Sequence, residues 1–219
     1  MQDMDMLQLA RLHAWDWFAR ETTGHDWHHV RRVHDLAVKI AEIEGGDLTL
    51  IELAAYAHDI GDYKFHASEE AGIQATRLFL MRCMVPHELA KQVEDIAHRV
   101  SFKGRDIPDD MPTLEGKIVQ DADRLDAIGA IAIARMFTYG GAHGRPIHDP
   151  DATLFYAKNA QEYVEHGKKS RSTFNHIFEK LMHLKDRLHT PTARQIAQKR
   201  HDFMMLFAEQ FQNEWDGKC

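Results

Sequence analysis

The chain has 219 residues, a length at which one hydrophobic core stabilises a fold without disulfides or structural metals. Its 44% hydrophobic and 28% charged residues exclude a disordered chain, and a net charge of −7 argues against a nucleic-acid-binding surface. Two cysteines exclude a disulfide framework and suit the reducing cytoplasm, where we expect the protein to reside.

Helical periodicity dominates the sequence, and no segment shows the alternation of a β-strand. The first residues predict an amphipathic helix that is acidic where a secretion signal would be basic. No apolar run reaches the roughly 20 residues of a membrane span, so we expect no membrane partner. The predicted helices are residues 4–20, 26–44, 49–60, 68–83, 87–100, 114–138, 154–166, 173–187 and 191–215. The prediction is an all-α, compact multi-helix bundle, with a single domain over residues 1–219.

Local signals mark several helix starts and two non-helical segments. Ser68 precedes two glutamates, and Thr190 precedes Pro191, so both Ser68 and Thr190 are predicted N-caps. The last helix carries a predicted packed stripe of aromatic residues at i+4 intervals, Phe203, Phe207, Phe211 and Trp215. Residues 101–112 and the Gly- and Pro-rich residues 139–150 resist a helical interpretation. We predict that residues 139–150 form a mobile cover over the site described next.

An apolar helix, LIELAAYAHDI, ends in the titratable pair His58 and Asp59. A buried carboxylate needs compensation, which for such a pair taken alone is most often a hydrogen bond. His29 also faces inward, because Val33 and Ala37 follow it at i+4 and i+8.

Three carboxylates lie in six positions of a third apolar helix, KIVQDADRLDAIGAIAIA. They are Asp121, Asp123 and Asp126, and periodicity does not separate them as inward-facing residues. Inward carboxylates and histidines together call for a cation. Mixed nitrogen and oxygen ligands suit a borderline divalent metal such as Mn, Fe, Co or Ni.

These residues give the sequence a resemblance to the HD superfamily, whose pattern is H…HD…D. More narrowly, the chain looks like the bacterial single-domain HD phosphohydrolases, whose hallmark phrase is close to KIVQDADRLDAIGA. The segments SFKG at 101–104, GRP at 144–146 and NHIFEKL at 175–181 match the style of that family. The resemblance implies one HD domain over residues 1–219, with the motif-bearing helices in about 20–140 and further helices in about 153–216.

The resemblance also implies roles for individual residues. The metal ligands would be His29, His58, Asp59 and Asp123, with Asp121 behind them as a supporting residue. Asp62 lies where some HD nucleotidases have an acidic proton-transfer residue. Dinuclear relatives use extra histidines, often a His-His pair, which is absent here although His66, His87 and His98 are available. We therefore expect one divalent ion, which would be Mn, Ni, Co, Fe or Mg.

The expected activity is hydrolysis of a phosphate ester or anhydride in a nucleotide or similar small molecule, by a metal-activated water. Candidate phosphate-binding cations lie in or beside the motifs: Arg32, Lys64, Lys103 and Arg124, with Arg145, His148 and Lys180 as weaker candidates. Cyclic-nucleotide phosphodiesterase activity and a non-catalytic ligand-sensing HD module remain alternatives. A di-iron HD oxygenase would need the missing histidines. We expect no nucleic-acid partner and a monomer or homodimer.

Overall fold

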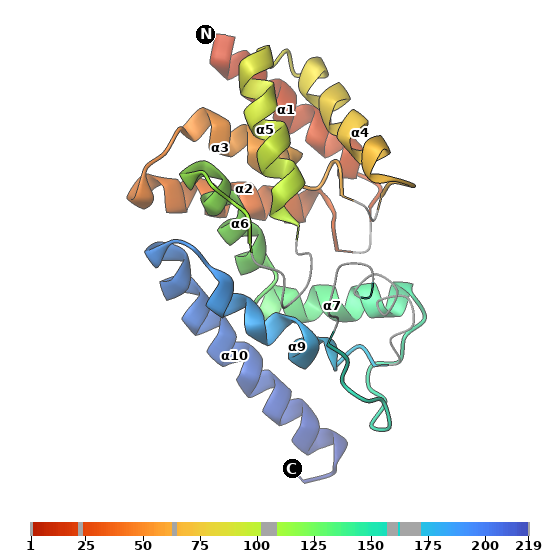
Figure 1. The fold of residues 1–219 in the computed structure, drawn as a ribbon. Helices are drawn as coiled ribbons and strands as arrows, with labels where there is room; N and C mark the ends of the chain where they lie inside the picture. Colours follow the sequence, from red (N-terminus) through yellow and green to blue (C-terminus); the bar gives the residue numbers. More distant parts are fainter. Residues whose placement is uncertain are drawn as a thin grey trace. The chain divides into compact units, whose positions relative to one another are not determined.

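A computed structural model describes residues 2–21, 24–62, 65–101, 109–156, 162 and 172–218. Every regular element within these ranges is helical, so the predicted all-α fold is confirmed (Figure 1). Within the same ranges, no helix is both long and apolar enough to cross a membrane. The chain divides into two compact units, Met1–Phe102 with Asp109–Asp123 and Lys103–Pro108 with Arg124–Cys219. The single domain over the whole chain stays a prediction.

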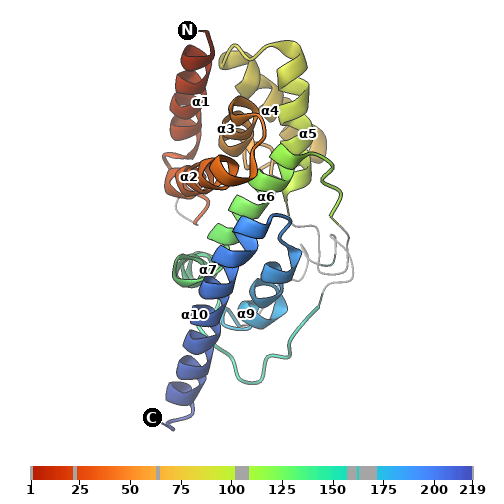
Figure 2. The same cartoon turned by 90° about the vertical axis from the view of Figure 1, so that its left-hand side faces the viewer.

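The first unit is a helical bundle around one apolar helix. Its elements are α1 (Gln2–Phe18), α2 (Trp27–Glu44), α3 (Leu48–Ala57), α4 (Glu69–Arg82), α5 (His87–Val100) and α6 (Leu114–Asp126), the last as far as Asp123. Helix α3 contacts α1, α2, α4 and α5, and Figure 2 shows it among these helices. Its residues from Leu53 to Ala57 are all buried, as expected of a helix that is apolar almost all round.

Side-chain caps start helices α2, α3 and α4 of this unit. Asp26 lies three residues before the predicted ligand His29, and its carboxylate accepts a hydrogen bond from His29 N at 2.9 Å, which begins α2. Asp47 accepts from Leu50 N at 3.2 Å and starts α3. Ser68 accepts from Ala71 N at 3.2 Å and starts α4, which confirms the predicted N-cap. Each cap satisfies a backbone donor that the helix itself leaves unpaired.

The turn that follows α3 lies directly on α4, because both surfaces carry glycine. A Cβ atom on Gly61 would lie 2.6 Å from Thr76 Oγ1 and 2.9 Å from the carbonyl oxygen of Gly72. A Cβ atom on Gly72 would lie only 2.3 Å from the carbonyl oxygen of Gly61. This backbone-to-backbone packing fixes the position of the turn that carries His58, Asp59 and Asp62.

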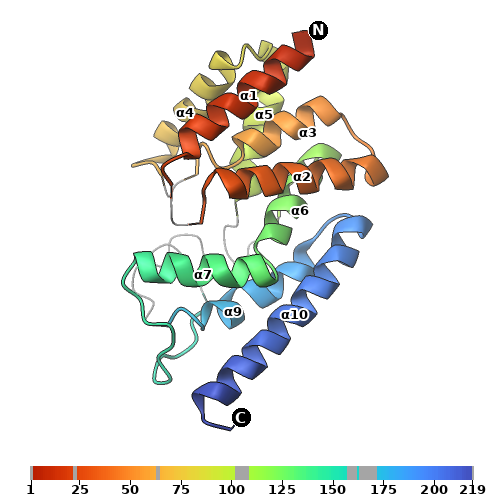
Figure 3. The ribbon, with the colours of Figure 1, turned by 180° about the vertical axis from the view of Figure 1, so that it is seen from behind.

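The second unit contains α7 (Ala130–Ala142), the short α9 (His176–Glu179), the 3₁₀ helix η1 (Leu181–Arg187) and the long α10 (Pro191–Trp215). Helix α10 packs on α7 and η1, and α9 packs on η1; Figure 3 shows α10 as the long blue helix. The hydroxyl of Thr190 accepts from Ala193 N at 3.2 Å, so this predicted cap is also confirmed.

The helix predicted over residues 114–138 is wrong, since it is broken between α6 and α7. Gly129 has φ +93°, and a Cβ there would lie 3.1 Å from Arg200 Cβ. The positive φ keeps the chain out of a helical path between the end of α6 at Asp126 and the start of α7 at Ala130, at a residue where only glycine is unstrained. The apolar pattern continues across the break, so periodicity alone does not show it.

Other expectations of local structure also need correction. Helix α7 continues to Ala142, inside the segment expected to be non-helical, because glycine weakens a helix without forbidding it. Residues 173–187 form α9 and η1 instead of one helix, because Lys180 has φ −136°. Residues 154–156 are not helical, and the rest of the helix predicted at 154–166 lies outside the described residues except Glu162.

The aromatic stripe of α10 is packed only in part. Phe211 stacks on Phe174 with 4.2 Å between ring centroids, but Phe203 is 50% exposed and Trp215 is 47% exposed. The fully packed face of α10 is formed instead by smaller residues, Ala193, Ala197, His201, Met204 and Ala208.

Candidate metal centre

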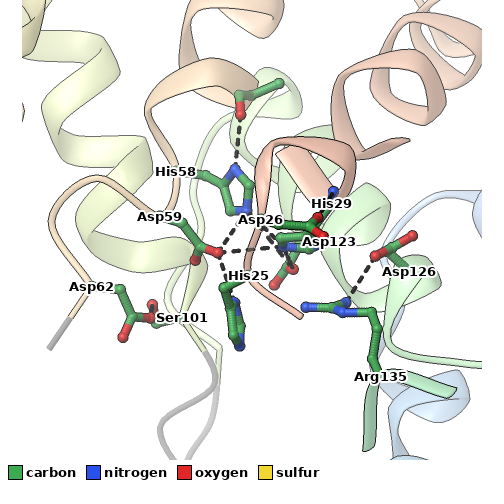
Figure 4. Close-up of polar contacts among 11 residues, drawn as sticks. His25, Asp26, His29, His58, Asp59, Asp62, Ser101, Asp123, Asp126 and Arg135 are labelled. Carbon is green, nitrogen blue, oxygen red and sulfur yellow. Dashed lines mark hydrogen bonds and ion pairs between the residues drawn. The ribbon is translucent and has the colours of Figure 1, made fainter. Parts of the chain in front are cut away.

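The structure brings the four predicted ligands together from three elements of the first unit (Figure 4). His29 lies in the first turn of α2, His58 caps the C-terminus of α3 and Asp59 follows it, and Asp123 lies on α6. His29 Nε2 lies 3.3 Å from Asp59 Oδ2 and 3.5 Å from Asp123 Oδ1. These separations are of the size found between neighbouring ligands of one cation.

The tautomer of His58 is fixed by the end of its own helix. Its Nδ1–H donates to the carbonyl oxygen of Ala55 at 2.8 Å, which leaves Nε2 as the ring nitrogen that faces the other residues of the centre. That Nε2 lies 3.2 Å from His29 Nε2 and 3.5 Å from Asp59 Oδ2. Two facing imidazole nitrogens require a proton or a cation between them, and the surrounding carboxylates favour the cation.

The centre is buried, and the pKa of its first carboxylate is lowered. His29 is 0% exposed, His58 1% and Asp59 5%. Burial by itself raises the pKa of Asp59, but the charges of His58 and His25 and hydrogen bonds from His25 and His29 outweigh it and hold the pKa well below its usual value. Two imidazole nitrogens and two carboxylate oxygens fit a borderline divalent metal.

A fifth residue of the centre, His25, was missed by the sequence interpretation. Its Nδ1 lies 2.9 Å from Asp59 Oδ2. Ligand atoms of the described residues form two groups in which all separations are within 4.8 Å: His25 with His29 and Asp59, and His29 with His58 and Asp123. His25 precedes α2 and therefore has no helical periodicity. The available signal was its position next to the N-cap Asp26, only four residues before His29.

The structure separates the three carboxylates that the sequence left equivalent. Asp123 lies beside His29, with its side chain 25% exposed. Asp121 is completely buried on the same helix, where its supporting role stays a prediction. Asp126, which belongs to the second unit, forms a salt bridge with Arg135, with 2.8 Å between Asp126 Oδ2 and Arg135 Nη1.

The predicted proton-transfer residue Asp62 lies in the same turn as Asp59. It is 5% exposed, and its backbone N–H donates to the carbonyl of Asp59 at 3.2 Å. The hydroxyl of Ser101, at the C-terminal end of α5, donates to Asp62 Oδ2 at 3.0 Å. This bond orients the carboxylate and connects the C-terminal end of α5 to the turn that carries Asp59.

The structure describes two of the four predicted phosphate-binding residues, and these two differ in burial. Arg32 is half-buried on α2, one helical turn after His29. Arg124 is 2% exposed, and its guanidinium donates to the carbonyl of Arg187 within the second unit. Lys64 and Lys103 lie outside the described residues. Phosphate binding by these residues stays a prediction.

The additional histidines belong to neither of the two ligand groups found among the described residues. His66 Nε2–H donates to the carbonyl of Ile60 at 2.6 Å, and His98 pairs with Glu69 at 3.5 Å. His87 begins α5 at the surface. The expectation of one metal stays a prediction.

Known proteins resemble this chain over nearly its whole length. An HD domain model matches residues 26–128, which contain His29, His58, Asp59 and Asp123. The uncharacterized protein YpgQ of Bacillus subtilis is 36% identical over 218 residues, which are 99% of this chain and 97% of YpgQ.

Solved structures agree with these sequence relations. The crystal structure of YpgQ in complex with ADP has a TM-score of 0.74 and 34% identity, covering 97% of this chain and 100% of that chain. An HD-superfamily hydrolase from Bacillus thuringiensis has a TM-score of 0.73 and 38% identity over 98% of both chains. A protein from Lactobacillus plantarum has a TM-score of 0.85 and 33% identity over 97% of both chains. The chain belongs to the HD superfamily of hydrolases.

Proposed function

We propose that the protein is a phosphohydrolase that depends on one divalent metal and acts on a nucleotide. The observation that carries the proposal is the pair of Nε2 atoms of His29 and His58, 3.2 Å apart and facing carboxylate oxygens of Asp59 and Asp123. The crystal structure of the relative YpgQ in complex with ADP supports a nucleotide as the ligand class. A complete set of ligands favours catalysis over the sensing module considered from the sequence.

Some residues of the centre would bind the metal, and another would accept a proton. His29 and His58 would hold a divalent cation through nitrogen atoms, and Asp59 and Asp123 through carboxylate oxygens. Such a cation would supply a lowered pKa of bound water and polarisation of a phosphoryl oxygen. A carboxylate oxygen of Asp62, oriented by Ser101, accepts the proton lost by the attacking water.

The substrate class follows from charge, and we favour nucleoside triphosphates cleaved to a monophosphate and pyrophosphate. Lys64 and Lys103 beside the motifs would neutralise a long phosphate chain better than a single phosphate requires, whereas the guanidinium of Arg124 is buried and already donates to the carbonyl of Arg187. Cyclic-nucleotide cleavage would use the same metal chemistry and stays the alternative. The absence of a nucleic-acid or membrane partner, a monomeric or homodimeric state and residence in the cytoplasm are further expectations.

The test is a screen of phosphorylated metabolites with Mn²⁺, Co²⁺, Ni²⁺ or Mg²⁺ added, with released phosphate and pyrophosphate measured separately. Nucleoside monophosphates, triphosphates, cyclic nucleotides and p-nitrophenyl phosphate are the substrates compared. His29→Ala and Asp59→Asn should lose bound metal and activity together. The matched control is His28→Ala, because His28 is the exposed neighbour of His29 on the same helix. Normal metal content in both site variants, or cleavage of p-nitrophenyl phosphate without any nucleotide, would overturn the proposal.

A further inference from the structure

We propose that His25 is a positioning residue that holds the carboxylate of Asp59 in the orientation needed to bind the metal. The inference rests on the metal site of the proposed function and adds a residue outside the H…HD…D pattern. Its basis is the distance of 2.9 Å between His25 Nδ1 and Asp59 Oδ2, at which Nδ1–H donates a hydrogen bond to the carboxylate oxygen.

Three imidazole rings surround the same carboxylate oxygen. From Asp59 Oδ2, His25 Nδ1 lies at 2.9 Å, His29 Nε2 at 3.3 Å and His58 Nε2 at 3.5 Å. Figure 4 shows that His25 approaches Asp59 separately from the pair formed by His29 and His58. The shortest of the three contacts therefore comes from the residue that the ligand pattern does not include.

The position of the His25 ring is itself fixed by aromatic packing and by its backbone. The ring meets His29 edge to face at a centroid distance of 5.4 Å and Phe65 at 6.2 Å. Phe65 in turn packs on Phe18, which is 1% exposed, at 6.0 Å. The next residue, Asp26, caps α2. A donor held in this way keeps Asp59 in one orientation before any metal binds.

Ligation by His25 is the alternative that the experiment below separates from a supporting role. His25 forms one compact group of candidate ligand atoms with His29 and Asp59, and His29, His58 and Asp123 form the other. Carboxylate ligands of metal sites are commonly hydrogen-bonded by a second residue, and loss of that residue weakens metal affinity by about 10–100-fold. We expect a loss of that size, with the number of bound ions unchanged.

The experiment compares His25→Ala, His25→Asn and His25→Gln in the full chain. The amide nitrogen of asparagine lies close to the position of Nδ1, whereas that of glutamine lies close to the position of Nε2. Mn²⁺ affinity and stoichiometry are measured by calorimetric titration, the absorption spectrum is recorded with Co²⁺, and thermal melting reports folding. His28→Ala is the control for loss of an exposed histidine in the same segment.

We expect His25→Ala and His25→Gln to weaken Mn²⁺ binding, and His25→Asn to restore most of the affinity with the wild-type Co²⁺ spectrum. Unchanged affinity in His25→Ala would overturn the proposal. So would a His25→Asn variant that binds as weakly as His25→Ala with an altered Co²⁺ spectrum, because that result makes His25 a ligand. Failure of the wild type to bind Mn²⁺, or full binding by His29→Ala, would instead refute the proposed metal site.

Discussion

Replacing Gly72 with alanine is expected to destabilise the first unit and to weaken metal binding, although Gly72 touches no predicted ligand. The new Cβ would lie 2.3 Å from the carbonyl oxygen of Gly61. That separation is roughly 1 Å shorter than an ordinary contact between a methyl carbon and an oxygen. The obstacle is backbone and has no rotamer to change, so the turn containing Gly61 must move. Asp59 and Asp62 flank Gly61 in that turn and would move with it.

The size of the effect follows from two opposing contributions. Overpacking a well-filled site costs about 1–3 kcal/mol, and a contact with backbone belongs at the upper end of that range. Alanine improves helix propensity at this position of α4 by about 1 kcal/mol. The expected net loss is about 2 kcal/mol, which for a chain of this length lowers the melting temperature by roughly 4–8 °C.

The assay is thermal melting followed by circular dichroism, with Mn²⁺ affinity measured on the same samples. Gly141→Ala is the matched control, because Gly141 also lies in a helix and a Cβ there meets nothing within 4 Å. That variant should melt at the wild-type temperature or above it. If Gly72→Ala melted with the control and bound Mn²⁺ normally, the inferred packing of the HD turn on α4 would be wrong.

Three further changes test separate contacts of the first unit. Burial lowers the pKa of His34, but hydrogen bonds to Glu52 and Asp35 outweigh it and raise that pKa. The protonated His34 ring therefore stabilises the folded state fully below about pH 6.5, the unfolded-state pKa of histidine. This stabilisation is lost as the pH rises through the raised folded-state pKa. His34→Gln should accordingly reduce stability, measured by urea unfolding, more at pH 6 than at pH 9, and an equal reduction at both would contradict this. Ser101→Ala removes the hydrogen bond to a buried carboxylate and should lose about 1.5–3 kcal/mol in the same assay while Mn²⁺ stoichiometry stays normal; loss of bound metal would show a different role. Asp47→Ala should lose about 1 kcal/mol of unfolding free energy and Asp47→Asn much less, whereas equal losses would exclude capping.

Much of the fold was predictable from the sequence because its signals are local. The cap residues Ser68 and Thr190 act within their own first turns, and the apolar length of α3 requires burial whatever surrounds it. The inward direction of His29 follows from Val33 and Ala37 on the same face. The break at Gly129 was not predictable in this way, because its cause is a positive φ at a position packed against α10, far along the chain.

The sequence by itself determined the helical class, the HD motif and the residue types able to hold a divalent metal. Periodicity reports only which face of a helix is apolar, so it could not rank Asp121, Asp123 and Asp126. Only the tertiary structure placed Asp123 beside His29 and paired Asp126 with Arg135. It also brought His25, which lies outside any helix, to 2.9 Å from Asp59, 34 residues later in the chain. The physical reason is that a metal centre depends on distances between atoms of different elements, and these distances exist only after the helices have packed.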